Sequence, residues 1–122
     1  MTEPKLTARA SVLLDTLCRV YRERLANGAS DTQSRFFGSA EDIRRRYLLD
    51  WESRDLQRAC YSLQTAGYLE FIALDNQPDE ISITDAAVIH SEQRFARAFS
   101  SVQSVVENGL KLAQQFKFHS GS

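Results

Sequence analysis

Apolar residues near the middle of the chain recur at spacings of three and four positions. This spacing puts them on one face of a helix and leaves polar side chains on the other. The apolar set is Leu56, Ala59, Cys60 and Leu63. Gly67 follows, and glycine readily takes the left-handed conformation that closes a helix. We therefore predict a helix over residues 53–66.

After Gly67 the helical spacing gives way to a β-pattern. Residues 68–72, YLEFI, are rich in β-favouring side chains, and Ile81 and Ile83 alternate with polar neighbours in residues 80–84. Residues 75–79 between the two runs, DNQPD, are turn-forming. The pattern predicts a β-hairpin over residues 68–84.

Two further helices are expected before this pair of elements. An apolar stripe from Leu6 to Leu25 predicts a first helix over about residues 7–27, with Thr7 as its N-cap. A second helix is expected over about residues 39–49, capped by Ser39. Residues 29–38 between these helices are expected to be a polar linker. It contains Phe36 and Phe37, and at least one of these rings should fill the gap between the helices.

The end of the chain has the pattern of one long helix, expected over residues 85–118, followed by a disordered tail at 119–122. Its apolar positions are separated mostly by three and four, and the stripe is too long for a small domain to cover alone. Two such helices can pack along each other, so we expect a homodimer. The predicted dimerisation residues are Phe95, Phe99, Val102, Val106, Leu110 and Phe116. Asn108-Gly109 is a point where this helix could end or bend.

The order of helix, short turn, helix, glycine, strand, polar turn and strand resembles the winged helix-turn-helix superfamily of small bacterial DNA-binding transcriptional regulators. The residues that carry the resemblance are LQRACYSLQTAGYLE, from Leu56 to Glu70, and ISITDAA after the hairpin. The resemblance implies a mainly α fold with a small β-hairpin wing (α+β). Residues 1–84 would form the winged helix-turn-helix domain, and residues 53–66 would be its recognition helix.

For this family the resemblance implies a sequence-specific, DNA-binding transcriptional regulator. The outward face of the recognition helix would present Arg54, Gln57, Arg58 and Tyr61. Arginine can bond bidentately to guanine and glutamine to adenine, so this face suits the reading of double-stranded DNA. Phosphate contacts are expected from Arg44, Arg45, Arg46 and Arg35. The alternative to DNA contact is that these arginines form an ordinary exposed face, where neighbouring acidic residues balance their charge.

The predicted wing is acidic. The sequence has no lysine or arginine between Arg58 and Arg94, whereas Asp75 and Asp79 would lie at the tip of the hairpin. DNA should repel such a tip. Either the wing stays off the duplex, or the chain is a protein-protein interaction module that uses its acidic wing or its C-terminal helix and does not bind DNA.

Composition limits the classes of protein to which the chain can belong. The 122 residues are 43% hydrophobic and 25% charged, which is typical of one globular domain, and the formal net charge of −1 gives no electrostatic footprint. We expect a cytoplasmic protein, because the N-terminus has no secretion signal and no apolar run could span a membrane.

No enzyme chemistry is expected. The two histidines, His90 and His119, have no cysteine or carboxylate neighbours at metal-ligand spacing, and Cys18 and Cys60 are expected to be buried and reduced. No glycine-rich phosphate loop or nucleophile motif is present. The sequence therefore suggests no catalytic residue, metal or cofactor.

Overall fold

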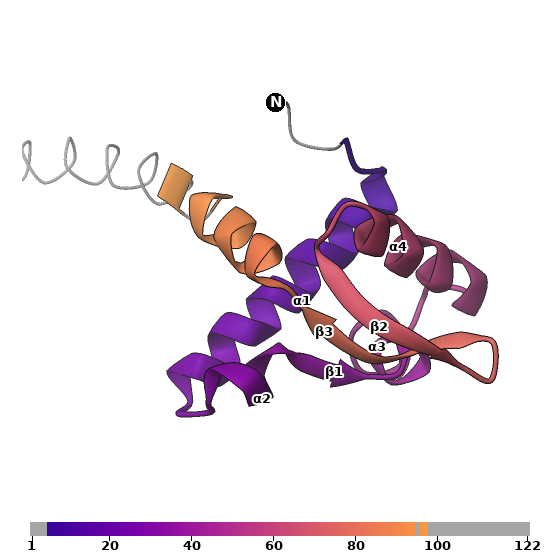
Figure 1. The fold of residues 1–122 in the computed structure, drawn as a ribbon, viewed down its shortest axis with the longest axis horizontal. Coiled ribbons are helices and arrows are strands. Elements are labelled where there is room, and N and C mark those ends of the chain that lie inside the picture. Colours follow the sequence, from indigo (N-terminus) through magenta and orange to yellow (C-terminus); the bar gives the residue numbers. More distant parts are fainter. Residues whose placement is uncertain (1–4, 95, 98–122) are drawn as a thin grey trace, which may run out of the picture. The chain divides into compact units, whose positions relative to one another are not determined.

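The computed structural model describes residues 5–94 and 96–97 of the chain. They are mainly helical and include one small antiparallel sheet, so the fold class is α+β. The elements in chain order are α1 (Ala8–Ala26), α2 (Asp31–Arg35), β1 (Phe36–Gly38), α3 (Ala40–Tyr47), α4 (Ser53–Thr65), β2 (Leu69–Leu74) and β3 (Gln77–Ile83) (Figure 1). Residues 85–94 are also helical.

The chain divides into two compact units, Met1–Ile89 and His90–Ser122, and all seven labelled elements belong to the first. Ala87 and Val88, just before this division, are buried in the core of the first unit. In the second unit residues 90–94 and 96–97 are helical. The predicted dimerisation residues, from Phe95 to Phe116, and the tail at 119–122 lie outside the described residues.

The sheet has the strand order β1-β3-β2, so the last strand in the chain is the central one. β3 pairs antiparallel with both neighbours, with Ser82 opposite Phe36 in β1 and Ile83 opposite Leu69 in β2. Ile81 and Ile83 of this central strand are almost fully buried, at 0% and 2% exposure. The alternating pattern of β3 thus turns its apolar face to the helices.

The predicted linker at residues 29–38 is wrong, because it contains α2 and β1. The hydroxyl of Ser30 accepts a hydrogen bond from Gln33 N at 3.2 Å and so caps α2. Phe37 is buried and Phe36 is exposed, as alternation along a strand requires. A three-residue strand that pairs with residues more than forty positions away leaves almost no local signal.

The hairpin is tighter than the sequence predicted. Its turn consists of Asp75 and Asn76 alone, both with positive φ (50° and 61°), as in the two-residue turns that suit the twist of a hairpin. β3 therefore begins at Gln77, not at residue 80. β1 pairs with β3 only at Ile81 and Ser82, so β3 is an edge strand at Pro78. A proline can be accommodated at such an edge.

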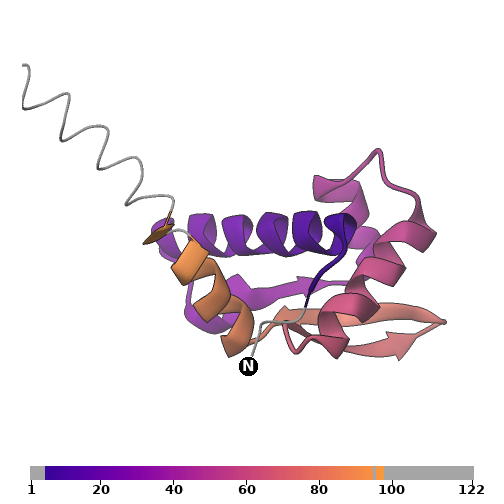
Figure 2. The ribbon, with the colours of Figure 1, turned by 90° about the horizontal axis from the view of Figure 1, so that it is seen from above.

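The core lies between α1, α3, α4 and the inner face of the sheet. Figure 2 shows α1 running along the sheet, with α4 beside its N-terminal half. The largest side chains with less than 2% exposure include Leu13, Leu14, Leu17, Ile43, Leu56, Leu63, Leu69 and Ile81. Two predicted N-caps are confirmed: Thr7 Oγ1 accepts from Ala10 N at 3.2 Å, and Ser39 forms a capping box with Asp42. Within the described ranges no helix is long and apolar enough to cross a membrane.

Candidate nucleic-acid interface

The outward face of α4 is polar. Four residues of α4 are buried against the core, namely Leu56, Ala59, Cys60 and Leu63, and they match the predicted apolar set. On the opposite side Arg54 and Arg58 are exposed and lie one helical turn apart, with Tyr61 one turn further along. Gln57 is half-buried at the edge of this face. The structure thus brings together the four side chains that were expected to read bases.

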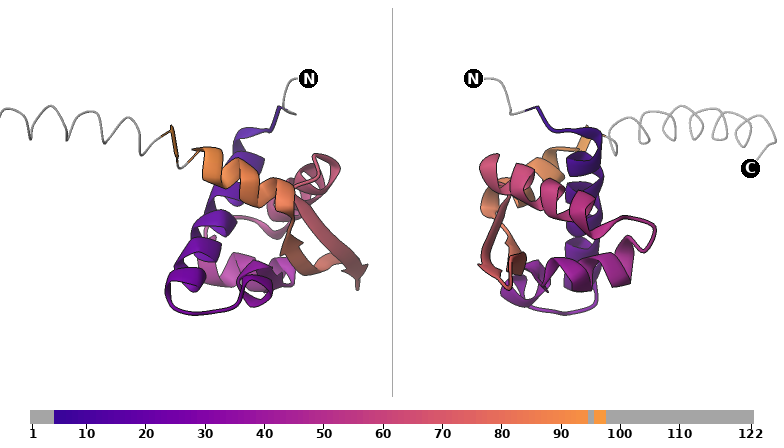
Figure 3. Two further views of the ribbon diagram at one scale, coloured as in Figure 1. Left: turned by 60° about the vertical axis from the view of Figure 1, so that its left-hand side comes forward. Right: turned by 90° about the vertical axis from the view of Figure 1, so that its right-hand side faces the viewer.

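The hairpin contacts one flank of α4 near the C-terminal end of the helix (Figure 3). The rings of Tyr61 and Phe71 pack edge to face, with centroids 5.1 Å apart. Gln64 Nε2 donates to the carbonyl oxygen of Phe71 at 3.5 Å. Tyr61 is therefore held by β2 while 44% of its surface stays exposed.

The three arginines of α3 are not equivalent. Arg44 is held by Glu41, whose Oε1 accepts from Nη2 at 2.6 Å and from Nε at 2.9 Å. The hydrogen bond from Arg44 keeps the pKa of Glu41 below its usual value. Arg45 lies 3.8 Å from the same carboxylate but is 68% exposed, and Arg46 is exposed. Arg45 and Arg46 are thus the α3 arginines most open to an external anion.

Arg35, one of the predicted phosphate contacts, is paired with two acids of the fold. Its Nη1 donates to Asp85 Oδ1 at 2.6 Å, and its Nε lies 2.8 Å from Asp31 Oδ2. The Nε contact has the distance of an ion pair but not the alignment of a hydrogen bond. Both carboxylates raise the pKa of Arg35, with Asp85 the larger cause. Because the guanidinium already binds two acids and is only 21% exposed, Arg35 is less open to a phosphate than Arg45 or Arg46.

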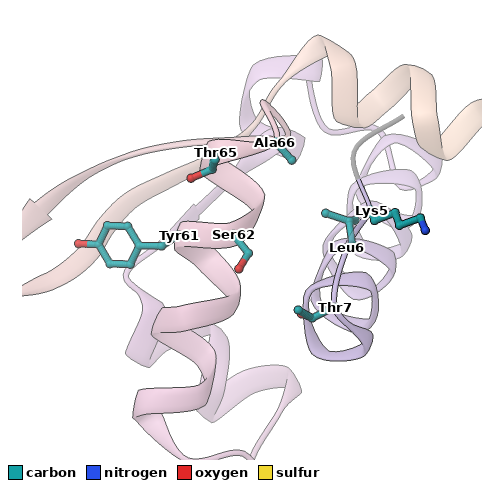
Figure 4. Close-up of a pocket in the computed structure, with 7 residues that line it drawn as sticks. All are labelled: Lys5, Leu6, Thr7, Tyr61, Ser62, Thr65 and Ala66. Atoms are coloured by element: carbon teal, nitrogen blue, oxygen red, sulfur yellow. The ribbon is translucent and has the colours of Figure 1, made fainter. Parts of the chain in front are cut away.

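An open groove separates the start of α1 from α4 and was not predicted from the sequence. It consists of two adjoining hollows of about 440 and 480 Å³, which share Thr7 and Ser62. We call it the α1–α4 groove. Figure 4 shows Ser62 on the side of α4 that faces the segment before α1, and Tyr61 projecting from the other side. The charged residues among those that line it are Lys5, Arg9, Asp55 and Arg58.

Arg9 connects the two walls of this groove. Its Nη1 lies 3.0 Å from Asp55 Oδ2, and its guanidinium lies over the ring of Trp51, 5.5 Å from the centroid. Because the side chains are partly exposed, we regard this contact as a modest attachment between the starts of α1 and α4. Arg9 follows the cap Thr7, and neither charge nor spacing in the sequence indicated that it would face α4.

The hairpin combines acidic and apolar side chains on its surface. Glu70, Asp75 and Glu80 are exposed, and Asp79 is half-buried with its Oδ1 accepting from Glu80 N at 2.7 Å. Ile72 and Leu74 alternate along β2 and are 48% and 45% exposed. Their side chains project from the sheet face opposite the core, because residues two apart in a strand share a face.

The described residues contain no group of three or more His, Cys, Asp or Glu that could hold a metal ion. Cys18 and Cys60 are both buried, and neither is part of a disulfide bond. Burial raises the pKa of the Cys60 thiol to about 12, so this thiol is neutral at physiological pH and a poor nucleophile. Cys18 Sγ lies 3.7 Å from the carbonyl oxygen of Ala87, to which it donates.

No family model matches the chain, and no curated protein or solved structure is significantly similar to it. Function must therefore be inferred from the side chains themselves. Four features have side chains that could bind a ligand or partner: the outward face of α4, the exposed arginines of α3, the α1–α4 groove and the acidic hairpin.

Proposed function

We propose that this chain is a winged helix-turn-helix protein that binds double-stranded DNA in a sequence-specific manner as a transcriptional regulator. In this proposal α3 and α4 form the helix-turn-helix, α4 is the recognition helix, and β2 and β3 form the wing. Three features support it: the order of the elements, the short connection of residues 48–52 between α3 and α4, and the sheet order β1-β3-β2.

The observation that carries the proposal is the outward face of α4. Arg54 and Arg58 are exposed one turn apart on a helix of 13 residues, which is about 20 Å long. A helix of this size fits a major groove about 12 Å wide. Each arginine can then form two hydrogen bonds to the edge of a guanine, while Arg45 and Arg46 of α3 approach phosphates.

The proposal also includes a cytoplasmic homodimer with no enzymatic activity and no cofactor. The support for the homodimer is the apolar stripe from Phe95 to Phe116 in the sequence. A two-fold dimer would set two copies of α4 about one turn of DNA apart, and each copy would read one half of a pseudo-palindrome.

Light scattering after size-exclusion chromatography tests the dimer. The full chain should have about twice the mass of one 13.9 kDa chain. Val102→Glu puts a charge in the apolar stripe and should give the monomer, whereas the neighbouring Gln103→Glu adds the same charge outside the stripe and should not. A wild-type monomer at micromolar concentration would contradict the dimer.

Fluorescence anisotropy against a pool of labelled duplexes tests DNA binding. Binding should saturate and weaken steeply as salt is raised, because bound phosphates release counterions. Arg54→Ala and Arg58→Ala should each weaken binding to the preferred sequence roughly tenfold or more. Arg19→Ala removes an arginine from α1 that is 61% exposed and should have little effect. If the wild type does not bind DNA even at low salt, the regulator function is ruled out.

The acidic hairpin supports one rival function, a protein-protein interaction module. Its exposed Ile72 and Leu74 lie among acids, a combination suited to a basic, apolar partner. In that case Asp75→Asn with Asp79→Asn should abolish binding of the partner protein, and Arg54→Ala with Arg58→Ala should leave that binding intact. DNA recognition predicts the reverse outcome for the two double variants.

A further inference from the structure

The two flanks of α4 differ in charge and in shape. On one flank Ser62 faces the α1–α4 groove. On the other flank Gln64 bonds to the carbonyl of Phe71 in the hairpin. These two residues are only two positions apart in α4, so they lie at nearly the same height on the helix and on opposite sides.

A helix in the major groove has a sugar-phosphate strand along each side. The groove is about 12 Å wide and a helix with its side chains is about 10–12 Å across, so both flanks come close to phosphates. The charge and hydrogen-bonding groups on each flank therefore decide which strand the protein can hold.

The α1–α4 groove carries the groups that bind phosphate in protein–DNA contacts. Thr7 and Ser62 provide hydroxyls, Arg9 and Arg58 provide cations, and Lys5 lies at the rim. Among the lining residues that the structure describes, Asp55 is the one acid, and it is paired with Arg9 at 3.0 Å. The groove is open to solvent, and its two hollows of about 440 and 480 Å³ adjoin at Thr7 and Ser62.

The hairpin flank has the opposite character. Glu70, Asp75 and Glu80 are exposed there, and no lysine or arginine occurs between Arg58 and Arg94 in the sequence. A phosphate strand on this side would meet like charges, and the hairpin itself has no cation to offset them.

We infer that the DNA strand on the α1 side of α4 sits in the α1–α4 groove, where Thr7, Ser62 and Lys5 contact its phosphates, and that the hairpin does not hold the second strand. This assigns to residues 5–7 and the start of α1 the contact with the DNA backbone that a basic wing would otherwise supply. The inference rests on the proposed function, because it specifies how α4 would be seated on DNA.

A matched pair of charge substitutions tests this asymmetry. Ser62→Glu and Gln64→Glu introduce the same side chain at the same height of α4, on the groove flank and on the hairpin flank respectively. Ser62→Glu should weaken DNA binding by about tenfold or more, and Gln64→Glu by less than about threefold. Thermal unfolding of both variants establishes that each is folded.

Asp55→Asn provides a second test that does not depend on tolerance at Ser62. It removes the only acid among the described residues that line the groove, so DNA should bind about threefold more tightly. The loss of the ion pair with Arg9 should lower the melting temperature slightly. A purely structural role for Asp55 predicts weaker binding and lower stability together.

The outcomes separate this inference from the proposed function. If the wild type does not bind DNA, both fail. If the wild type binds, the inference alone is overturned in either of two cases: Ser62→Glu and Gln64→Glu weaken binding equally, or Asp55→Asn weakens it.

Discussion

At the scale of single residues, some arginines of this chain are paired within the fold and others are exposed to solvent. Arg24, Arg35 and Arg44 have their guanidinium groups committed inside the fold. Arg24 donates to the carbonyl of Phe36 at 2.6 Å and lies over the ring of Phe37, 4.6 Å from its centroid. Arg54 and Arg58 instead project from α4 into solvent. A cation that is already paired gains less from a phosphate, so the exposed group is the one to test for DNA contact.

Tyr21 and Asp31 form a pair whose contribution to stability should depend on pH in two directions. Tyr21 Oη donates to Asp31 Oδ1 at 2.6 Å. Burial, together with this bond, raises the pKa of Tyr21 above 10.0, so its contribution is present below pH 10 and is lost as the pH rises through the folded-state pKa. The same bond lowers the pKa of Asp31 below 3.8, so that contribution is present above pH 4 and is lost at lower pH.

Tyr21→Phe should therefore lower the free energy of unfolding at neutral pH, and its difference from the wild type should shrink both in strong acid and above pH 10. Urea titrations at about pH 3, 7 and 11 measure this difference. Tyr61→Phe removes a hydroxyl from the exposed face of α4 and is the control. A difference for Tyr21→Phe that stays constant with pH would show that the pair is not titrating as described.

At the scale of elements, the hairpin turn determines where β3 begins. Because Asp75 and Asn76 both have positive φ, only two residues are needed to reverse the chain, and Gln77 already pairs with Leu74. The sequence DNQPD indicated a turn but not its length, since Asp, Asn and Pro all favour turns of several types. This explains why the start of β3 was predicted three residues too late.

The same turn gives a test of backbone strain. Asn76→Val should destabilise the protein by about 1–2 kcal/mol, because a β-branched residue is strained at a φ of 61°. Asn76→Gly should be neutral or stabilising. Asn27, at the end of α1, has a φ of −90°, so Asn27→Val should change the stability by no more than about 0.5 kcal/mol. Equal effects at both asparagines in thermal or urea unfolding would exclude strain as the cause.

At the scale of the whole molecule, helices with a strong apolar period were predictable and elements fixed by distant partners were not. α4 begins at Ser53 as predicted and ends one residue before the predicted end. It was predictable because its apolar period and Gly67 are local signals. β1 depends on β3 for its hydrogen bonds, and α2 is a single capped turn, so neither has a local period to reveal it. For the candidate site, the exposure of Arg54 and Arg58 followed from the helical period, whereas the commitment of Arg35 to Asp31 and Asp85 depended on tertiary contacts.

The position of β3 in the middle of the sheet has a consequence for how the chain folds as it is synthesised. β1 and β2 do not pair with each other, so neither has a partner strand until β3 has emerged. The bond between Ser82 Oγ and the carbonyl of Arg35 closes a loop of 47 residues, which is slow compared with helix formation. Nascent chains that end before Gln77 therefore lack the strand that completes the sheet over the apolar face of the helices, and that interval is when a chaperone would be most needed.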